Sequence, residues 1–270
     1  MSENQQLSLE GLNFTTLELA ESAHIFTITL NRPKRKNAMN AEMTNELTYA
    51  LDWAAQERRI RVVIIAANGD TFCAGGDLRS MSGNPEGGIV SNVPHREDSK
   101  DVAHSIRHMN KPVITKIQGS VLAGALLMVC NATHAIAADH AKFSAPEILR
   151  GIWPFMVMAG LFRVMPKRQG LDFIMRGQAM SAAEAAQTGL VNKTVPAAEL
   201  DTEVATLASE LASLAPGTMQ MGLAGYIQQE DQDFDGALAF LRTQIAACLK
   251  SPDAKEGITA FLEKREPKWD

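Results

Sequence analysis

Three short stretches of the sequence carry residue types that together could do chemistry at a carbonyl group. The first, Thr71 to Leu78, follows an apolar run and contains the pair Gly75-Gly76. Adjacent glycines let a ligand approach the backbone closely, and backbone N–H groups at such a turn can hold a negatively charged oxygen. A Gly-Gly pair on its own more often marks an ordinary turn. Gly76 is therefore a candidate oxyanion donor only if other stretches support it.

The second stretch runs from a predicted strand, Val113–Ile117, through Gly119 into an apolar helix predicted over residues 123–132. The first N–H groups of a helix have no intrahelical partner, and the helix end carries a partial positive charge. Gly124 lies at this end. It is therefore a second candidate donor for the same oxygen.

The third stretch contains a single carboxylate, Glu147, directly after Pro146 and among apolar residues. Apolar surroundings disfavour the charged form of a carboxylate and so tune it toward a general base. The alternative is a structural ion pair, for which Arg150 is the nearest partner along the chain. Taken alone, Glu147 fits the ion pair better than catalysis.

Strands and helices alternate around these stretches. Strand patterns cover Phe14–Leu19, His24–Leu30, Val62–Ala67 and Val113–Ile117. Helices are predicted after the cap Asn40, over Asp101–Asn110 and over residues 123–132. From Met158 onward the pattern is helical throughout, with helices after Ser181, over Leu200–Leu214, over Phe234–Leu249 and after Ser251-Pro252. The sequence predicts an α/β core followed by a helical region.

Composition excludes several classes of protein. The 26 basic and 31 acidic side chains give a net charge of −5, whereas a nucleic-acid surface is normally basic. Three separated cysteines, Cys73, Cys130 and Cys248, form no metal or disulfide pattern, and the six histidines show no ligand spacing. No apolar run reaches the roughly 18 residues of a membrane span. The polar N-terminus has no signal-peptide pattern, so we expect a cytoplasmic protein with no membrane partner.

With the three stretches in this order, the sequence resembles the enoyl-CoA hydratase/isomerase family, also called the crotonase family. Four further segments are similar to family motifs: the NRP…NA turn at Asn31–Met39, the CD…A…F stretch at Cys130, Ala135 and Phe143, the A.EA…GLV segment at Ser181–Asn192, and the last helix at Glu256–Arg265. The resemblance covers the chain from about Leu17 to Lys268. Each motif is loose, but the ordered set is specific.

The resemblance implies an α/β fold built as a spiral of β-β-α turns, followed by a helical C-terminal trimerisation region. Residues 1–12 are then expected to be disordered, 13–195 to form the spiral core with the CoA and oxyanion site, and 196–270 to form the helical region. It also implies an acyl-CoA substrate, a homotrimer or dimer of trimers, and no cofactor, because coenzyme A is part of the substrate.

The resemblance further implies roles for individual residues. It makes Glu147 the catalytic carboxylate and Gly76 and Gly124 the oxyanion donors. The residues implied for CoA or substrate binding are Lys34, Arg35, Lys36, Ala38, Ala74, Asp77, Leu78 and Arg79, with Phe261 and Lys264 reaching a CoA held by a neighbouring subunit. For these charged groups a solvated surface is the alternative. Phe155, Met156 and Met158 are expected either in the acyl pocket or in the core.

One residue departs from the family pattern. Hydratases of the family use two glutamates to hold and exchange a water, and the first would lie three residues after Gly124, where this chain has Leu127. A leucine cannot orient water or transfer a proton. The sequence therefore favours isomerisation of an enoyl-CoA double bond by Glu147 alone. A hydratase, another thioester-enolate reaction with one carboxylate, and a non-catalytic CoA-binding protein stay open as alternatives.

Overall fold

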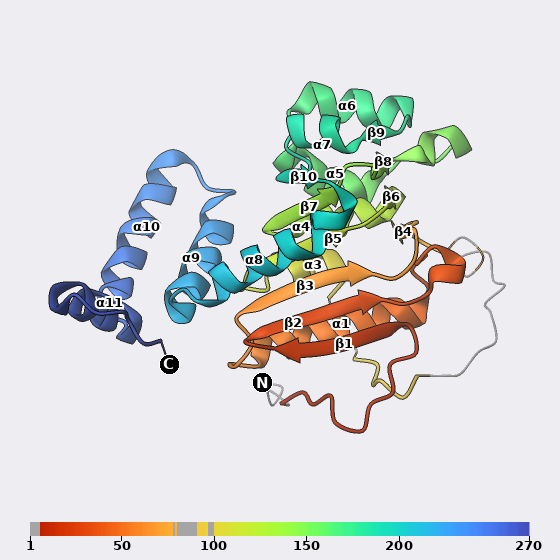
Figure 1. The fold of residues 1–270 in the computed structure, drawn as a ribbon. Helices are drawn as coiled ribbons and strands as arrows, with labels where there is room; N and C mark the ends of the chain where they lie inside the picture. The colour runs from red at the N-terminus through yellow and green to blue at the C-terminus, as the bar shows by residue number, and fades with distance from the viewer. Residues whose placement is uncertain (1–5, 78, 80–90, 97–99, 270) are drawn as a thin grey trace.

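The computed structural model describes residues 6–77, 79, 91–96 and 100–269. Its larger sheet has six strands in the order β1 (Leu17–Ser22), β2 (Ile25–Leu30), β3 (Val62–Ala67), β5 (Val113–Ile117), β7 (His134–Ala138) and β10 (Lys193–Val195) (Figure 1). β1 pairs with β2 antiparallel, and every other pair in this sheet is parallel.

A second sheet has four short strands in the order β4 (Thr71–Cys73), β6 (Ser120–Leu122), β8 (Lys142–Ser144) and β9 (Met180–Ser181). β4, β6 and β8 pair in parallel, and each follows within a few residues of β3, β5 or β7 in the larger sheet. Each pass of the chain thus adds one strand to both sheets. This repetition is the expected spiral of β-β-α turns, and it brings the ends of β4, β6 and β8 to one edge.

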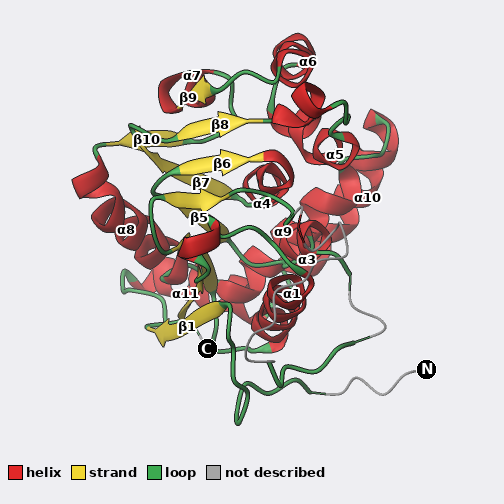
Figure 2. Ribbon diagram, turned by 90° about the vertical axis from the view of Figure 1, so that its right-hand side faces the viewer, coloured by secondary structure: helices red, strands yellow, loops and turns green. Residues whose placement is uncertain are grey.

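Helices connect and cover the sheets. The first half of the chain contributes α1 (Ala41–Gln56), α3 (Val102–Arg107) and α4 (Leu126–Asn131), with the 3-10 turns η1 (Pro33–Arg35), η2 (Ala123–Ala125) and η3 (Pro146–Arg150). The second half contributes α5 (Phe155–Val164), α6 (Lys167–Arg176), α7 (Ala182–Gln187), η4 (Ala197–Glu199), α8 (Leu200–Ala212), α9 (Pro216–Gln229), α10 (Phe234–Cys248) and α11 (Pro252–Glu263). Figure 2 shows α8 on one side of the larger sheet and α1, α3 and α4 on the other.

The central strand β3 is buried on both faces because each face packs on a different layer. Val63 and Ile65 belong to the core beneath α1, α3 and α4, whereas Val62 and Ile64 belong to a second core beneath α8. Alternating side chains of a strand point to opposite faces, so a strand covered on both sides is apolar at every position. The helix α8, which begins at Leu200, is therefore part of the sandwich that supports the sheet.

Two predicted helix starts are confirmed by their caps. The Asn40 side chain accepts the Met43 N–H at 2.9 Å, which satisfies a free donor at the start of α1. Ser181 and Glu184 form a reciprocal capping box at the start of α7. Both helices thus begin where a side chain can replace the missing carbonyl.

Other expectations differ from the structure. The first strand begins at Leu17 rather than Phe14, because the chain before it is held by Glu46, which accepts bonds from Thr15 and Thr16. The prediction of an entirely helical chain after residue 158 is wrong, because β9 is a strand of the smaller sheet and β10 is a strand of the larger one. Of the segment 1–12 that was expected to be disordered, residues 1–5 lie outside the described residues, whereas Leu7 and Leu9 pack against the core.

The last three helices extend away from the sheets (Figure 1). Their exposed side chains include several large apolar ones, namely Phe234, Leu238, Leu241, Ile245, Leu249, Ile258, Phe261 and Leu262. None of the helices in the described part of the chain is both long and apolar enough to cross a membrane.

Candidate active site

The three stretches singled out in the sequence meet at one pocket of about 780 Å³. Gly76, Gly124 and Glu147 all line it, and so does Leu127. The remaining lining comes from η3, from the loop after it and the first turn of α5, and from residues within 35–39, 74–77 and 122–123, together with Arg79. The fold thus assembles residues that are more than 70 positions apart in sequence into one site.

The two glycine turns are in direct backbone contact. Gly75 has φ +84°, a conformation that favours glycine, and a Cβ at this position would lie 2.9 Å from Leu122 O and 3.1 Å from Gly124 N. Any side chain at Gly75 would therefore push the two turns apart. Because Gly75 has no side chain, the turn after β4 can lie against the turn after β6.

The two candidate oxyanion amides are available at this contact. The amides on either side of Gly76 are used nearby, since Asp77 N donates to Met39 O at 2.9 Å and Gly75 N to the Cys73 sulfur at 3.4 Å. Within the described part of the chain the Gly76 amide has no acceptor. Gly124 is the second residue of η2, where no carbonyl of an earlier turn is available, and the space beside its Cα is open. Both glycines line the pocket.

Glu147 lies in η3, just after Pro146, and its side chain is half-buried. Its Oε2 atom is buried without a hydrogen-bond partner among the described residues. Burial raises the pKa of this carboxyl group, and its own backbone N–H and the charge of Arg150 offset only part of that rise. A buried carboxylate oxygen without a partner is costly, which is typical of a group kept ready for a proton.

The wall near Glu147 is apolar. Leu127 lies at the position where the resemblance implies the first of the two hydratase glutamates, and its side chain is half-buried in the pocket lining. The other carboxylate among the described lining residues is Asp77, which forms an ion pair with Arg32 at 3.2 Å. Of the described lining residues, Glu147 is therefore the carboxylate best placed to accept a proton.

The residues expected to bind CoA separate into groups. Those that line the pocket are Arg35, Ala38, Ala74, Asp77 and Arg79. Lys34 and Lys36 are exposed in the same turn but do not line the pocket. Phe261 is 82% exposed, and with Lys264 it lies at the end of α11, outside this pocket. Leu78 lies outside the described residues.

The segment after Glu147 forms the apolar end of the pocket. Phe155 and Met156 line it, as the sequence suggested, whereas Met158 does not and instead accepts the Trp153 indole N–H at 3.4 Å. Trp153 itself lines the pocket and was not among the expected residues. Its position next to Pro154, ahead of a helix, was the signal available in the sequence.

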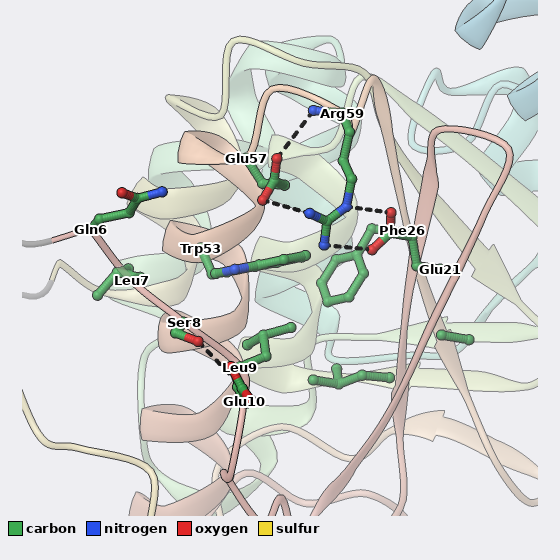
Figure 3. A pocket seen from close by; sticks show the side chains of 12 residues that line it. Gln6, Leu7, Ser8, Leu9, Glu10, Glu21, Phe26, Trp53, Glu57 and Arg59 are labelled. Atoms are coloured by element: carbon green, nitrogen blue, oxygen red, sulfur yellow. Dashed lines mark hydrogen bonds and ion pairs between the residues drawn. The ribbon is translucent and has the colours of Figure 1, made fainter.

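A second pocket, of about 700 Å³, lies between the N-terminal segment, β1, β2 and α1 (Figure 3). Arg59 lies there over the Trp53 ring, and its guanidinium bonds to both Glu21 and Glu57. The charged groups at its centre thus bind one another. This pocket contains none of the residues that the sequence singled out for chemistry.

Comparison with known proteins identifies the family of the chain. The human enoyl-CoA hydratase domain-containing protein 3, mitochondrial, is 32% identical over 245 residues, which are 91% of this chain and 80% of the human one. A probable enoyl-CoA hydratase, echA8, of Mycobacterium tuberculosis is 30% identical over 96% of this chain and 99% of its own. The solved structure of an enoyl-CoA hydratase from Mycobacterium smegmatis superposes with a TM-score of 0.85 at 30% identity, covering 94% of this chain and 98% of that one. The sequence model described as enoyl-CoA hydratase/isomerase matches residues 20–270, and the chain belongs to that family.

Proposed function

We propose that this protein is an enoyl-CoA isomerase in which Glu147 is the only proton carrier. The thioester carbonyl oxygen of the substrate accepts hydrogen bonds from the amides of Gly76 and Gly124. These donors are fixed before the substrate arrives, so they stabilise charge on the oxygen without reorganising. The acyl chain extends from there along the apolar wall toward α5.

The reaction then needs one base that becomes one acid. Glu147 removes a proton from C2 of a 3-enoyl thioester, and the electron pair moves toward the carbonyl oxygen to give a dienolate. The protonated Glu147 returns the proton to C4, and the double bond comes to lie between C2 and C3. No atom is gained or lost, so neither a water nor a second carboxylate takes part.

The observation that supports this proposal is that the pocket contains Glu147 at one of the two glutamate positions of the hydratases and Leu127 at the other. Glu147 has a buried oxygen without a partner among the described residues, and a hydrocarbon side chain occupies the position that holds another glutamate in the hydratases. A water between Glu147 and Leu127 would be held by one side chain only. Isomerisation is compatible with that arrangement, whereas hydration requires an oriented water.

A hydratase is the second candidate, because relatives such as the short-chain-enoyl-CoA hydratase of Clostridium acetobutylicum, 30% identical over 92% of this chain, carry that name. Another enolate reaction with one carboxylate is a further alternative. A purely CoA-binding role would not explain why the Gly76 amide and the buried Glu147 oxygen have no partner among the residues that the structure describes.

The deciding experiment measures hydration of crotonyl-CoA and isomerisation of a 3-enoyl-CoA side by side with the same preparation. We expect measurable isomerisation and slow or absent hydration. Hydration at about 10 s⁻¹ or more, an ordinary enzyme rate, would overturn the proposal. A preparation inactive in both assays that still binds CoA thioesters would favour the non-catalytic alternative.

We also propose that the exposed apolar side chains of α10 and α11 pack against further copies of the chain, in a trimer or a dimer of trimers. Phe261 and Leu262 are 82% and 73% exposed, although large apolar side chains usually lie inside a protein or at an interface. In that assembly Phe261 and Lys264 lie near a CoA bound to the neighbouring subunit. The reaction requires no cofactor beyond the coenzyme A of its substrate.

A further inference from the structure

We propose that Arg32, Asn37 and Asp77 are positioning residues that fix the direction of the Gly76 amide in the oxyanion hole. Arg32 and Asn37 belong to the NRP…NA turn, which the resemblance links to CoA binding through Lys34, Arg35 and Lys36 without giving Arg32 or Asn37 a role. The inference rests on the proposed function only in that the Gly76 amide acts on a bound thioester.

The Gly76 amide is not held by regular secondary structure. β4 ends at Cys73, and Gly76 then makes an isolated parallel bridge with Met39. Met39 N donates to Gly75 O at 2.8 Å, and Asp77 N donates to Met39 O at 2.9 Å. The peptide groups on both sides of Gly76 are thus fixed by Met39. The direction of the Gly76 amide depends on where the Met39 backbone lies.

Asn37 holds the turn that carries Met39. Its side chain is fully buried, and its Nδ2 donates to Asn68 O at 2.9 Å and to Thr71 O at 2.8 Å. Its Oδ1 accepts the Arg32 N–H at 2.8 Å, and its φ of +52° is a value that Asn tolerates better than most residues. One side chain thus ties the turn to both ends of the connection between β3 and β4.

Arg32 holds the turn from the other side. Its guanidinium donates to Ala38 O and to Asp77 Oδ2, the latter at 3.2 Å. Ala38 precedes Met39, and Asp77 follows Gly76, so one planar fork spans the bridge between the two segments. Both side chains are almost excluded from solvent, at 11% and 13% exposure, where the charge–charge attraction is only weakly screened. A lysine could not make both contacts with the same geometry.

The Cys73 thiol completes the connection. Its sulfur lies 3.0 Å from Asn37 O, to which the thiol donates, and accepts the Gly75 N–H at 3.4 Å. Burial raises the pKa of this thiol to about 12, so it stays protonated and keeps its donor. The bonds from Asn37 to Asn68 and Thr71, from Arg32 to Asp77 and from Cys73 to Asn37 join the turn at residues 32–39 to the chain between Asn68 and Asp77. None of these contacts needs the substrate.

A network of this kind acts on the reacting oxygen rather than on CoA. Displacing a catalytic donor by about 1 Å can cost on the order of 10²-fold in rate. Ground-state binding of an acyl-CoA depends chiefly on the nucleotide and the acyl chain. Disturbing the network should therefore slow enolate formation much more than it weakens binding.

The test compares Asp77→Asn and Arg32→Lys with Glu21→Gln. The control also replaces a carboxylate paired with an arginine by its amide, because Glu21 bonds to Arg59 with an O–N distance of 2.6 Å (Figure 3). Neither Glu21 nor Arg59 lines the active-site pocket. Each protein is mixed with a saturated acyl-CoA labelled with carbon-13 at the thioester carbonyl. Three quantities are measured: the carbonyl stretching frequency of the bound thioester, the rate of deuterium exchange at its α-carbon, and its Kd.

In the parent protein and in Glu21→Gln we expect the same lowered carbonyl frequency. In Asp77→Asn and Arg32→Lys we expect the frequency to return toward its solution value and the exchange rate to fall about 10–100-fold, with Kd within about threefold. If both variants keep the parent frequency and exchange rate, the network does not position the amide and the proposal is wrong. If the parent shows no lowered frequency, the oxyanion hole itself, and with it the proposed function, is refuted.

Asn37→Asp is a second variant because it is nearly isosteric but places a carboxylate against two carbonyl oxygens. If it folds, it should lose exchange at least as strongly as Asp77→Asn. If it does not fold, the two milder variants still decide the matter. Unchanged exchange in a folded Asn37→Asp protein would exclude Asn37 from the network.

Discussion

Gly75 packs directly on Gly124, although the two residues follow strands that are almost 50 positions apart in sequence. A Cβ on Gly75 would lie 3.1 Å from the Gly124 nitrogen and 2.9 Å from the Ala123 Cβ, whereas a Cβ on Gly124 would meet no atom within 4 Å. The contact is thus asymmetric. It brings the residue before Gly76 against the backbone of Gly124, and only Gly75 needs to lack a side chain for this contact.

Gly75→Ala should therefore damage both stability and activity. The new methyl group enters a filled space, and alanine at φ +84° adds strain of about 1–2 kcal/mol. We expect a lower midpoint in thermal unfolding and a fall in α-proton exchange, because the two amides move apart. Gly124→Ala is the matched control and should keep the parent unfolding midpoint. Equal midpoints for both variants would contradict the packing argument.

The pH dependence of catalysis should reflect the environment of Glu147. Burial raises the pKa of this carboxyl group above its ordinary value of 4.5, and the reaction needs the deprotonated form. Isomerisation should therefore fall on the acid side along a limb whose midpoint lies above 4.5. Because the folded-state pKa is raised, the stability contribution of Glu147 is present at low pH and is lost as pH rises through that pKa.

Glu147→Gln is the control for this limb, since the amide is nearly isosteric and does not titrate. It should lose about 10²–10⁴ in turnover and in α-deuterium exchange, while the Kd for a saturated acyl-CoA stays close to that of the parent. A variant that exchanged deuterium as fast as the parent would show that another group is the base.

A second buried carboxylate should matter for stability alone. Glu46 is fully buried, and its two oxygens accept the backbone N–H and the hydroxyl of both Thr15 and Thr16. Glu46→Gln turns one oxygen into an N–H₂ group that faces donors, which should lower the free energy of unfolding by about 1.5–3 kcal/mol. Denaturant unfolding measures this. Exchange at the α-carbon should be unchanged while the protein is folded.

Glu21→Gln serves as the comparison, because its ion pair with Arg59 is partly exposed and should contribute about 1 kcal/mol or less. If Glu46→Gln cost no more than Glu21→Gln, the four bonds to Thr15 and Thr16 would not be holding the entry to β1.

The core strands and the site could be predicted from sequence to different extents. The strands Val62–Ala67 and Val113–Ile117 were predicted with their observed bounds. Val62–Ala67 is a continuous apolar run, which is typical of a strand buried on both faces. The second sheet was missed. Its strands have two or three residues each, too few to show alternation, and they are stabilised by pairing between distant segments.

For the site, it was the resemblance to a family that singled out Gly76, Gly124 and Glu147 together; all three line one pocket, and their roles stay a prediction. The sequence did not predict the hydrogen bonds and the ion pair that hold the Gly76 turn in place. The contacts of Arg32 with Asp77 and of Asn37 with Thr71 join positions that are 45 and 34 residues apart, and no local pattern marks them. Contacts of this kind depend on the folded chain.

Assembly gives a prediction that does not involve the chemistry. Phe261→Asp combined with Leu262→Asp changes two exposed side chains at the end of α11, so it should not disturb the fold of a single chain. If α11 packs on a neighbouring copy, the charges should dissociate the oligomer. Light scattering should give a multiple of three of the 29.3 kDa chain for the parent and a smaller species for the variant. A monomeric parent would contradict the assembly.

Leu127 offers a gain-of-function test of the proposed chemistry. Its side chain lines the pocket three residues after Gly124, and hydration requires a second group there that holds a water and exchanges a proton with it. Leu127→Glu should therefore raise the rate of crotonyl-CoA hydration, followed as loss of the conjugated enoyl absorbance. Leu127→Gln is the matched control, because it has the same length and can bind water but cannot take up a proton. Only the glutamate variant should gain hydration; equal rates in both would mean that proton exchange at this position is not what limits the parent.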